Sequence, residues 1–236
     1  MLVIMESGAS EPELQRVIDR MIALGLDVHR SSGMTYTVLG GIGSASEIDL
    51  GEFRRMSGVR EAIRITSRWR LAARTVNPAG TRVRVRGIEV GGDAFVRLPG
   101  DAVIREVLES GQVRVLAAHA DALLVPSGAM DNAGLLRELG HAGEPVILKR
   151  GECSGVEDWL VAAEKILEAG NKDVILCESG VRTFSGGVLD CGAVAELRTL
   201  THLPVIAAPG DVASRPEIFE ALVKAAIAAG AQGILE

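Results

Sequence analysis

From residue 94 onward, short apolar runs of β type alternate with helical patterns, and this alternation constrains the fold more than any other feature. We expect strands at 94–98, 102–107, 122–125, 146–149, 174–177, 204–207 and 233–235. Helices are expected at 112–120, 132–139, 156–169, 188–200 and 216–229. Because alternating strands and helices form parallel sheets with right-handed crossovers, the sequence predicts an α/β fold of the (β/α) barrel type.

The predicted barrel is incomplete. Residues 81–236 are fewer than the about 200–250 residues of a closed eight-stranded barrel. Only Pro99, Gly100 and Asp101 separate the first two expected strands, whereas parallel neighbours need a crossover of about a dozen residues. Either these two segments form a hairpin or a piece of a longer barrel is missing. A hairpin is also expected upstream, at 82–86 and 88–90 around Gly87.

Residues 1–66 show a different pattern. Strands are expected at 2–5, 27–31, 35–42 and 59–66 and helices at 11–25 and 48–56, with Ser10 and Glu13 as a capping box. The order β-α-β-β-α-β is that of ferredoxin-like domains, a fold that carries no chemistry by itself. We therefore expect a small α+β ferredoxin-like domain of regulatory type at 1–66 and a linker at 67–80.

The composition excludes several function classes. A net charge of −6 and a content of two Trp, one Tyr and four Phe argue against nucleic-acid binding. No apolar run approaches the roughly 18 residues that cross a bilayer. Cys153, Cys177 and Cys191 lack CxxC spacing, so we interpret them as reduced thiols of a cytoplasmic protein. Cys177 lies within an apolar run and is predicted to be a core residue.

Charged or glycine-containing sequence follows several of the expected strands. Lys149-Arg150-Gly151 follows one run, Glu178-Ser179-Gly180 the next, and Asp211 stands after the run at 204–207. Barrel enzymes carry their catalytic residues at the carboxyl ends of the strands. Catalytic residues are therefore expected among these strand-end side chains.

These motifs resemble a known family. The resemblance is carried by VILKRG (146–151), ILCESGVRTF (175–184), LD (189–190), HLPVI (202–206) and KAAIAAGAQGI (224–234). They are similar to type I 3-deoxy-D-arabino-heptulosonate 7-phosphate (DAHP) synthase, in the subgroup with an N-terminal ferredoxin-like domain. The resemblance implies a transferase of the shikimate pathway of aromatic amino acid biosynthesis, which condenses phosphoenolpyruvate with erythrose 4-phosphate at a divalent metal (Mn or Mg). It also implies aromatic amino acids as effectors of the N-terminal domain.

Part of the family's site is present. The resemblance makes Lys149 a contact of phosphoenolpyruvate, with Arg150 completing the KRG motif. Glu178 matches the glutamate of the CERG motif, and Arg182 is kept in the stretch that follows. The resemblance thus implies Lys149, Arg150 and Glu178 as the candidate catalytic residues. It also implies Lys149, Arg150 and Arg182 as substrate-binding residues for a phosphoenolpyruvate-like anion.

Other parts of the site are replaced. The two arginines that bind the phosphate in the family correspond to Ser179 and Gly128, and Asp211 stands in place of the metal-binding histidine of the DPSHS motif. The cysteine of the AGPC motif has no counterpart around 98–101, and the KPRTS loop is absent. Glu236 matches the family's last-strand glutamate with a spacing one residue short, which leaves Asp211 and Glu236 as the candidate metal ligands.

Several interpretations remain open. The charged strand-end residues form either structural ion pairs at the barrel mouth or a residual anion pocket, and Lys149 has a third alternative as a Schiff-base lysine. The chain is then a degenerate synthase homologue with a binding, regulatory or subunit role, a working synthase, or a protein with another lyase or binding activity. Because a missing βα unit exposes sheet edges, we expect a homo-oligomer or a complex with a full-length synthase.

Overall fold

The computed structural model describes residues 1–32, 36–42, 48–63, 68–92, 94–184 and 186–236. The chain divides into two compact units, residues 1–67 and 68–236. Each unit has its own hydrophobic core.

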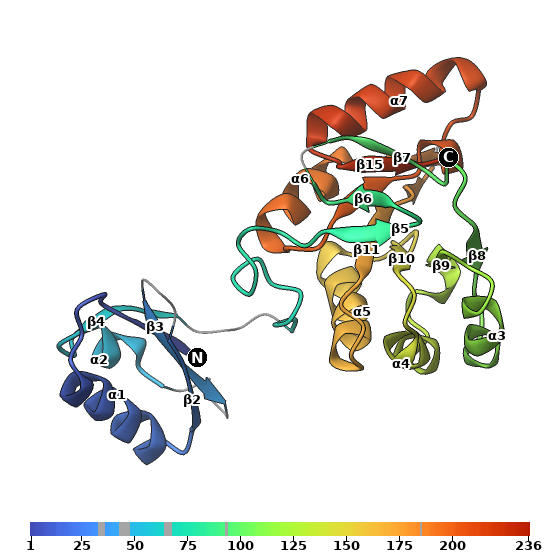
Figure 1. The fold of residues 1–236 in the computed structure, drawn as a ribbon. Helices are drawn as coiled ribbons and strands as arrows, with labels where there is room; N and C mark the ends of the chain where they lie inside the picture. The colour runs from blue at the N-terminus through green and yellow to red at the C-terminus, as the bar shows by residue number, and fades with distance from the viewer. Residues whose placement is uncertain (33–35, 43–47, 64–67, 93, 185) are drawn as a thin grey trace. The chain divides into compact units, whose positions relative to one another are not determined.

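The N-terminal unit is a four-stranded antiparallel sheet with two helices (Figure 1). Its elements are β1 (Leu2–Met5), α1 (Glu11–Ala23), β2 (Asp27–Ser32), β3 (Thr37–Ile42), α2 (Leu50–Arg54) and β4 (Val59–Ile63). The strand order β2-β3-β1-β4 places β1 between β3 and β4. This is the predicted ferredoxin-like arrangement, and alternate residues of its strands pack on α1. The strands expected at 35–42 and 59–66 fall partly outside the described residues.

The second unit contains a seven-stranded parallel sheet with helices on its outer face (Figure 1). The strands are β7 (Val96–Leu98), β8 (Ile104–Glu106), β9 (Ala122–Val125), β10 (Val146–Lys149), β11 (Val174–Glu178), β14 (Val205–Ala207) and β15 (Gly233–Leu235). The helices are α3 (Val113–Ala117), α4 (Ala133–His141), α5 (Val156–Glu168), α6 (Cys191–Leu200) and α7 (Pro216–Ala229). The prediction of an incomplete (β/α) barrel is confirmed.

The order of this sheet shows where the barrel is interrupted. It runs β7-β15-β14-β11-β10-β9-β8, so that β7 and β8, consecutive in sequence, lie at the two opposite edges. The hairpin alternative for these segments is therefore wrong, because the two strands do not pair. In an eight-stranded barrel one further strand would stand between these edges. The connection 99–103 spans that position instead.

The two faces of the sheet carry separate hydrophobic clusters. Leu123, Val125, Val146 and Leu148 point outward against the helices, whereas their neighbours along the same strands point into the barrel. The buried thiol of Cys177 belongs to the inner cluster, which confirms the prediction for this residue. The predicted hairpin also forms, as β5 (Val83–Val85) and β6 (Ile88–Val90), and its valines fill the same interior.

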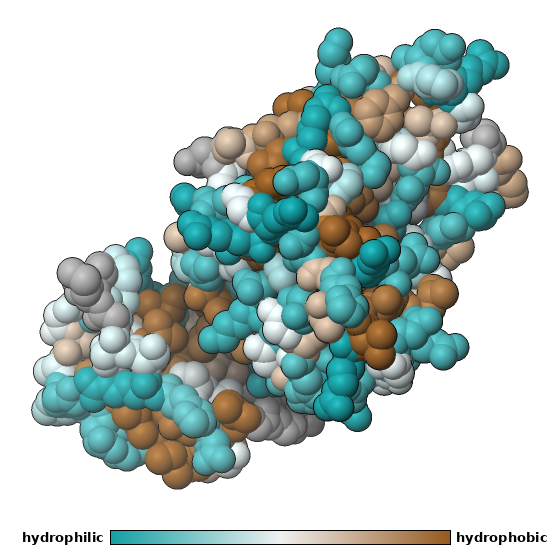
Figure 2. All heavy atoms as spheres, turned by 45° about the vertical axis from the view of Figure 1, so that its right-hand side comes forward, coloured by the Kyte–Doolittle hydropathy of each residue, from teal (hydrophilic) through white to brown (hydrophobic). Residues whose placement is uncertain are grey.

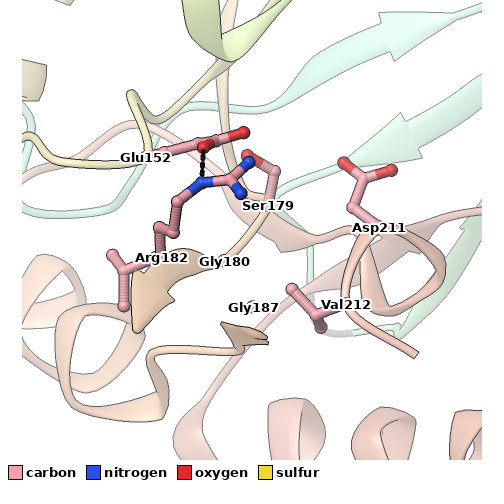
Figure 3. Close-up of a pocket in the computed structure, with 8 residues that line it drawn as sticks. Glu152, Ser179, Gly180, Arg182, Gly187, Asp211 and Val212 are labelled. Carbon is pink, nitrogen blue, oxygen red and sulfur yellow. Dashed lines mark hydrogen bonds and ion pairs between the residues drawn. The ribbon is translucent and has the colours of Figure 1, made fainter. Parts of the chain in front are cut away.

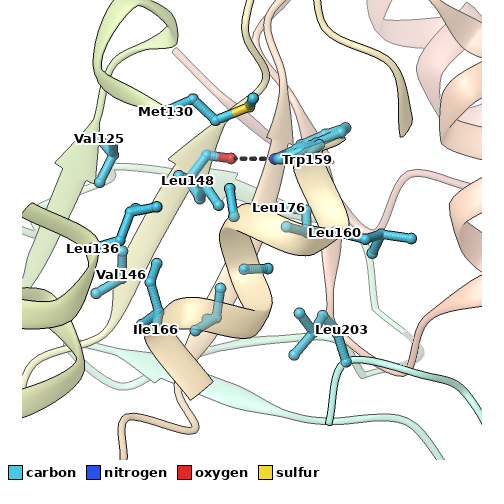
Figure 4. Packing of buried hydrophobic residues seen from close by; sticks show 14 of the residues in the cluster. Val125, Met130, Leu136, Val146, Leu148, Trp159, Leu160, Ile166, Leu176 and Leu203 are labelled. Atoms are coloured by element: carbon cyan, nitrogen blue, oxygen red, sulfur yellow. Dashed lines mark hydrogen bonds between the residues drawn. The ribbon is translucent and has the colours of Figure 1, made fainter. Parts of the chain in front are cut away.

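The outer cluster is centred on α5. Trp159 is fully buried there and donates its Nε1–H to the carbonyl of Leu148 at 3.2 Å (Figure 4). Around it pack Leu136, Leu160 and Ile166 from the helices (Figure 4). The contact ties α5 to β10, the strand whose end carries Lys149.

The sequence did not predict a second hairpin, β12 (Val181–Thr183) with β13 (Gly186–Val188). It lies between β11 and α6 and replaces the expected start of a helix at Val188. Helix α6 instead begins at Cys191, because the Asp190 carboxylate accepts a hydrogen bond from the Ala193 N–H as the N-cap. The expectation of a helix over 188–200 is wrong at its N-terminal end for this reason.

Residues 68–80, part of the expected linker, contact the second unit. The buried carboxylate of Glu164 on α5 accepts hydrogen bonds from the backbone N–H groups of Arg70, Leu71 and Ala72. Ala73 forms an isolated antiparallel bridge with Thr201. This segment is therefore anchored to the barrel by a buried, fully paired carboxylate.

The surface mixes polar and apolar side chains in the view of Figure 2. Several large apolar side chains of the second unit are exposed: Leu71, Val76, Leu108, Val115, Phe184, Val188, Ile218 and Ile227. Among the helices that the structure describes, none is long and apolar enough to cross a membrane.

Candidate functional site

The predicted site residues all lie at the carboxyl edge of the parallel sheet. Lys149 ends β10, Glu178 ends β11 and Glu236 directly follows β15. Arg150 follows Lys149, and Asp211 lies in the 3₁₀ turn after β14. The carboxyl ends of parallel strands meet at one edge, so residues far apart in sequence form one strand-end cluster.

Lys149 and Asp211 form an ion pair at this edge. The ammonium of Lys149 donates to Asp211 Oδ2 at 2.6 Å, and the lysine side chain is only 14% exposed. Glu236 is paired separately, with the guanidinium of Arg97 on β7. Both candidate metal ligands thus have a cationic partner.

These residues border a cavity of about 410 Å³. Its remaining lining is mostly apolar: Pro99, Ala102, Val103, Ile104, Leu124, Ala208, Gly210 and Leu235. Pockets that bind small molecules combine a mainly apolar lining with a few polar groups that fix orientation. The cavity has this character.

Arg150 lies deeper and holds two carboxylates together. Its Nη1 donates to Asp190 at 2.8 Å and to Glu178 at 3.2 Å, while its Nε donates to the Ser154 carbonyl. Glu178 is fully buried and also accepts from the Gly180 N–H. Burial raises the pKa of Glu178, an effect that the Arg150 charge opposes. Arg150 is committed to this internal network.

A smaller pocket lies beside the β12–β13 hairpin (Figure 3). Arg182 and Glu152 form an ion pair there, with Nε donating to Oε2 at 2.6 Å. Ser179, Gly180 and Asp211 complete much of its lining. Hydrogen bonding by Arg182 lowers the pKa of Glu152, so both groups are charged at neutral pH.

Short neutral side chains occupy the positions where the resemblance places phosphate-binding arginines. The hydroxyls of Ser127 and Ser179 lie 2.9 Å apart. Gly128 is exposed, and a Cβ added to it would meet no atom within 4 Å. This part of the edge therefore offers hydroxyl groups in place of cationic donors.

The donor set does not fit a resident divalent metal. Among the described residues, no group of three or more His, Cys, Asp or Glu side chains is arranged to hold one. Asp211 and Glu236 are each paired with a cation, and two carboxylates supply only a small part of the about six to eight oxygen ligands that a hard divalent ion takes. We derive no chemistry through a metal at this edge.

Sequence reasoning missed two members of this edge. Asp190 shares Arg150 with Glu178, and Glu152 pairs with Arg182. Asp190 stands directly before α6, and its signal was that of a helix N-cap. Glu152 follows the KRG motif, and nothing in the pattern indicated its partner.

A half-barrel with charged side chains at the carboxyl ends of its strands defines a protein of the (β/α)-barrel class. Residues 60–235 match the model of the DAHP synthetase I family, and residues 1–67 match the DAHP synthase ferredoxin-like domain. The chain therefore belongs to the DAHP synthetase I family of the shikimate pathway, in the subgroup with an N-terminal ferredoxin-like domain. The resemblance inferred from the motifs is confirmed.

Known relatives span most of the chain. It is 25% identical over 296 positions to a phospho-2-dehydro-3-deoxyheptonate aldolase of Thermotoga maritima, covering all of this chain and 88% of that protein. The crystal structure of a DAHP synthase from Thermotoga maritima matches with a TM-score of 0.70 at 25% identity, over 99% of this chain and 86% of that chain. A 2-dehydro-3-deoxyphosphooctonate aldolase of Acidithiobacillus ferrooxidans is 29% identical over 57% of this chain and 52% of its own length.

Proposed function

We propose that this chain is a DAHP-synthase-like protein that no longer catalyses the family condensation and acts by binding a small molecule. In that role it serves as a regulatory or subunit protein of the pathway. The observation that supports the lack of synthase activity is the charge balance of the strand-end cluster.

The cluster has no surplus of positive charge for a phosphorylated substrate. Together with their ion-pair partners, the cluster residues include the cations Arg97, Lys149, Arg150 and Arg182. The carboxylates among them are Glu152, Glu178, Asp190, Asp211 and Glu236. A phosphate dianion in a sheltered pocket requires charge-assisted donors, for which arginine is best suited. Here each cation already has a carboxylate partner.

The expected loss of affinity is large. A hydrogen bond to a charged group contributes about 1.5–3 kcal/mol. Replacing two phosphate-binding arginines by Ser179 and Gly128 therefore weakens phosphoenolpyruvate binding by about 10²–10⁴-fold. The missing KPRTS loop lowers it further.

Phosphoenolpyruvate binding to a charge-restoring variant tests this proposal. Gly128→Arg puts a guanidinium into open space at the carboxyl edge. Gly143→Arg makes the same charge change in open space before β10, at the amino ends of the sheet strands. We expect calorimetry to detect no phosphoenolpyruvate binding by the wild type and a measurable gain with Gly128→Arg alone. Micromolar binding by the wild type would contradict the proposal, as would equal gains with both variants.

A second candidate is a working DAHP synthase. It is favoured by Lys149, Arg150 and Glu178, which are retained at the correct edge, and by the similarity to the Thermotoga maritima aldolase over the whole chain. This candidate predicts metal-dependent condensation of phosphoenolpyruvate with erythrose 4-phosphate. Phosphoenolpyruvate consumption in the presence of erythrose 4-phosphate separates the two functions.

A further inference from the structure

The cavity beside Lys149 owes part of its wall to the interruption of the barrel. The connection between β7 and β8 contributes Pro99, Ala102 and Val103 to its lining. This connection spans the position between the two sheet edges where an eighth strand would stand. The cavity is therefore a feature of this shortened barrel, and its ligand need not be that of a complete one.

The polar side of the cavity presents charges of both signs. The ammonium of Lys149 has three N–H donors, and within the described part of the chain one partner, Asp211, is found for them. Asp211 uses Oδ2 for this contact, and Glu236 uses Oε1 for Arg97. Two N–H donors of Lys149, one oxygen of Asp211 and one oxygen of Glu236 are thus left for a ligand. They lie at one end of the mostly apolar cavity.

We propose that this cavity binds a zwitterionic α-amino acid with an aliphatic side chain. The ligand carboxylate accepts from Lys149, the ligand ammonium donates to Asp211 and Glu236, and the side chain packs on Ile104, Leu124 and Leu235. The inference rests on the proposed function, since it names the small molecule that the non-catalytic barrel would bind.

Charge complementarity selects this class over the alternatives. A phosphorylated ligand would meet the carboxylates of Asp211 and Glu236, and the two neighbouring cations, Lys149 and Arg97, are each already paired with one of them. A simple amine would leave the remaining Lys149 donors without an acceptor, and a simple carboxylic acid would leave the oxygens of Asp211 and Glu236 without a donor. Polar groups that a bound ligand shields from solvent need such partners. A zwitterion supplies both, and the cavity lies within the range of about 300–1,000 Å³ typical of ligand sites.

Calorimetry with the full chain and three matched probes tests the proposal. The probes are L-leucine, 4-methylpentanoate, which lacks the amine, and 3-methylbutylamine, which lacks the carboxylate. An aliphatic amino acid is used so that any aromatic effector site of the N-terminal unit is not probed. We expect L-leucine to bind at least about tenfold more tightly than either truncated probe, because each loses a charge-assisted hydrogen bond.

Two variants place the binding in the cavity. Lys149→Met should bring the affinity for L-leucine down to that for 3-methylbutylamine, and Asp211→Asn should weaken L-leucine and the amine but not 4-methylpentanoate. Lys172→Met, which removes an exposed lysine before β11, should change nothing. Circular dichroism establishes that each variant is folded, and Asp211→Asn provides the test if Lys149→Met does not fold.

Defined results overturn the inference. It is wrong if L-leucine shows no binding up to about 10 mM, far above the usual range of metabolite affinities. It is also wrong if Lys149→Met and Asp211→Asn leave L-leucine binding unchanged, or if the truncated probes bind as well as the zwitterion. If L-leucine behaves as expected while the protein also makes DAHP, only the proposed loss of synthase activity fails. If neither binding nor turnover is found, only this inference fails.

Discussion

At the scale of single residues, Arg150 balances the buried charges of the strand-end cluster. Its side chain is 7% exposed and contacts Glu178, which is fully buried, and Asp190, which caps α6. Hydrogen bonds and charge–charge attraction from Arg150 help to hold the pKa of Asp190 below its ordinary value despite burial, so that carboxylate stays charged. The arginine that the resemblance suggests as a substrate contact is thus also a structural residue.

Removing this guanidinium should be strongly destabilising. We expect Arg150→Met to lower the free energy of unfolding by about 3–5 kcal/mol, because it leaves the buried carboxylate of Glu178 and the partly buried one of Asp190 without their cation. Arg150→Met combined with Glu178→Gln should recover part of the loss, since one of those charges is then absent. Arg137→Met on the exposed side of α4 is the control and should change stability by less than about 0.5 kcal/mol. Urea denaturation measures all three, and equal effects of Arg150→Met and Arg137→Met would contradict the assignment.

At the scale of elements, the β12–β13 hairpin is held at its base by Glu178. One carboxylate oxygen of Glu178 accepts from the Gly180 N–H at 2.8 Å and from the Asp190 N–H at 3.4 Å, on the two sides of the hairpin. Gly180 has a φ of +94° and packs against Val212. The conformation and the close contact both require glycine at this position.

Gly180→Ala should therefore destabilise the second unit by about 2–3 kcal/mol through backbone strain and overlap with Val212. Gly186→Ala is a matched control, because Gly186 also has a positive φ but faces open space. It should cost less, and Gly180→Ala with Val212→Ala should recover the part due to overlap. Thermal unfolding of the four proteins measures this, and equal losses for the two single variants would show that overlap plays no part.

The N-terminal helix gives a prediction on pH. Hydrogen bonds from the Ser57 hydroxyl and from Ser10 lower the pKa of Glu13 from 4.5 to about 2. A lowered pKa means that the charged group stabilises the fold above pH 4.5 and that this contribution is lost as the pH falls toward 2. We expect NMR titration to give this low pKa and Glu13→Gln to remove that part of the acid dependence of unfolding. Glu61→Gln on β4 is the control, and a Glu13 pKa at its ordinary value would contradict the capping interaction.

The elements were predictable where a local signal was strong. The runs at 146–149 and 174–177 are continuously apolar because both faces of the sheet are covered, and they became strands as expected. The β12–β13 hairpin was not predictable, because its strands are exposed and show no alternating pattern. Its position depends on Glu178, a contact between residues that the sequence pattern does not connect.

At the scale of the whole molecule, the position of the missing barrel strand could be inferred from the short connection at 99–101. Three turn residues cannot carry a parallel crossover, so 94–98 and 102–107 could not be parallel neighbours. The sequence left the hairpin alternative open, because the place of β7 beside β15 is set by pairing over long range. The location of the candidate site at the carboxyl ends of the strands was predictable, because these ends converge. The ion-pair partners of Lys149, Arg150 and Arg182 were not predictable.

The open sheet also bears on assembly. Both edge strands are short, and β7 and β8 carry the exposed charged residues Arg97, Arg105 and Glu106, which discourages pairing edge to edge. Exposed apolar side chains such as Leu108, Val115 and Ile227 remain. We therefore predict association through side-chain surfaces, seen as a defined oligomer in sedimentation velocity. A monomer at about 100 μM, a concentration above typical micromolar dissociation constants, would contradict this prediction.

We propose that the chain keeps the family scaffold but has lost the surplus of positive charge that the family reaction needs. The most direct test follows phosphoenolpyruvate consumption by the purified chain in the presence of erythrose 4-phosphate, with manganese and with a chelator, after circular dichroism has shown that the protein is folded. We expect no consumption above the protein-free control under either condition. Consumption that yields DAHP with manganese and stops with the chelator would contradict it.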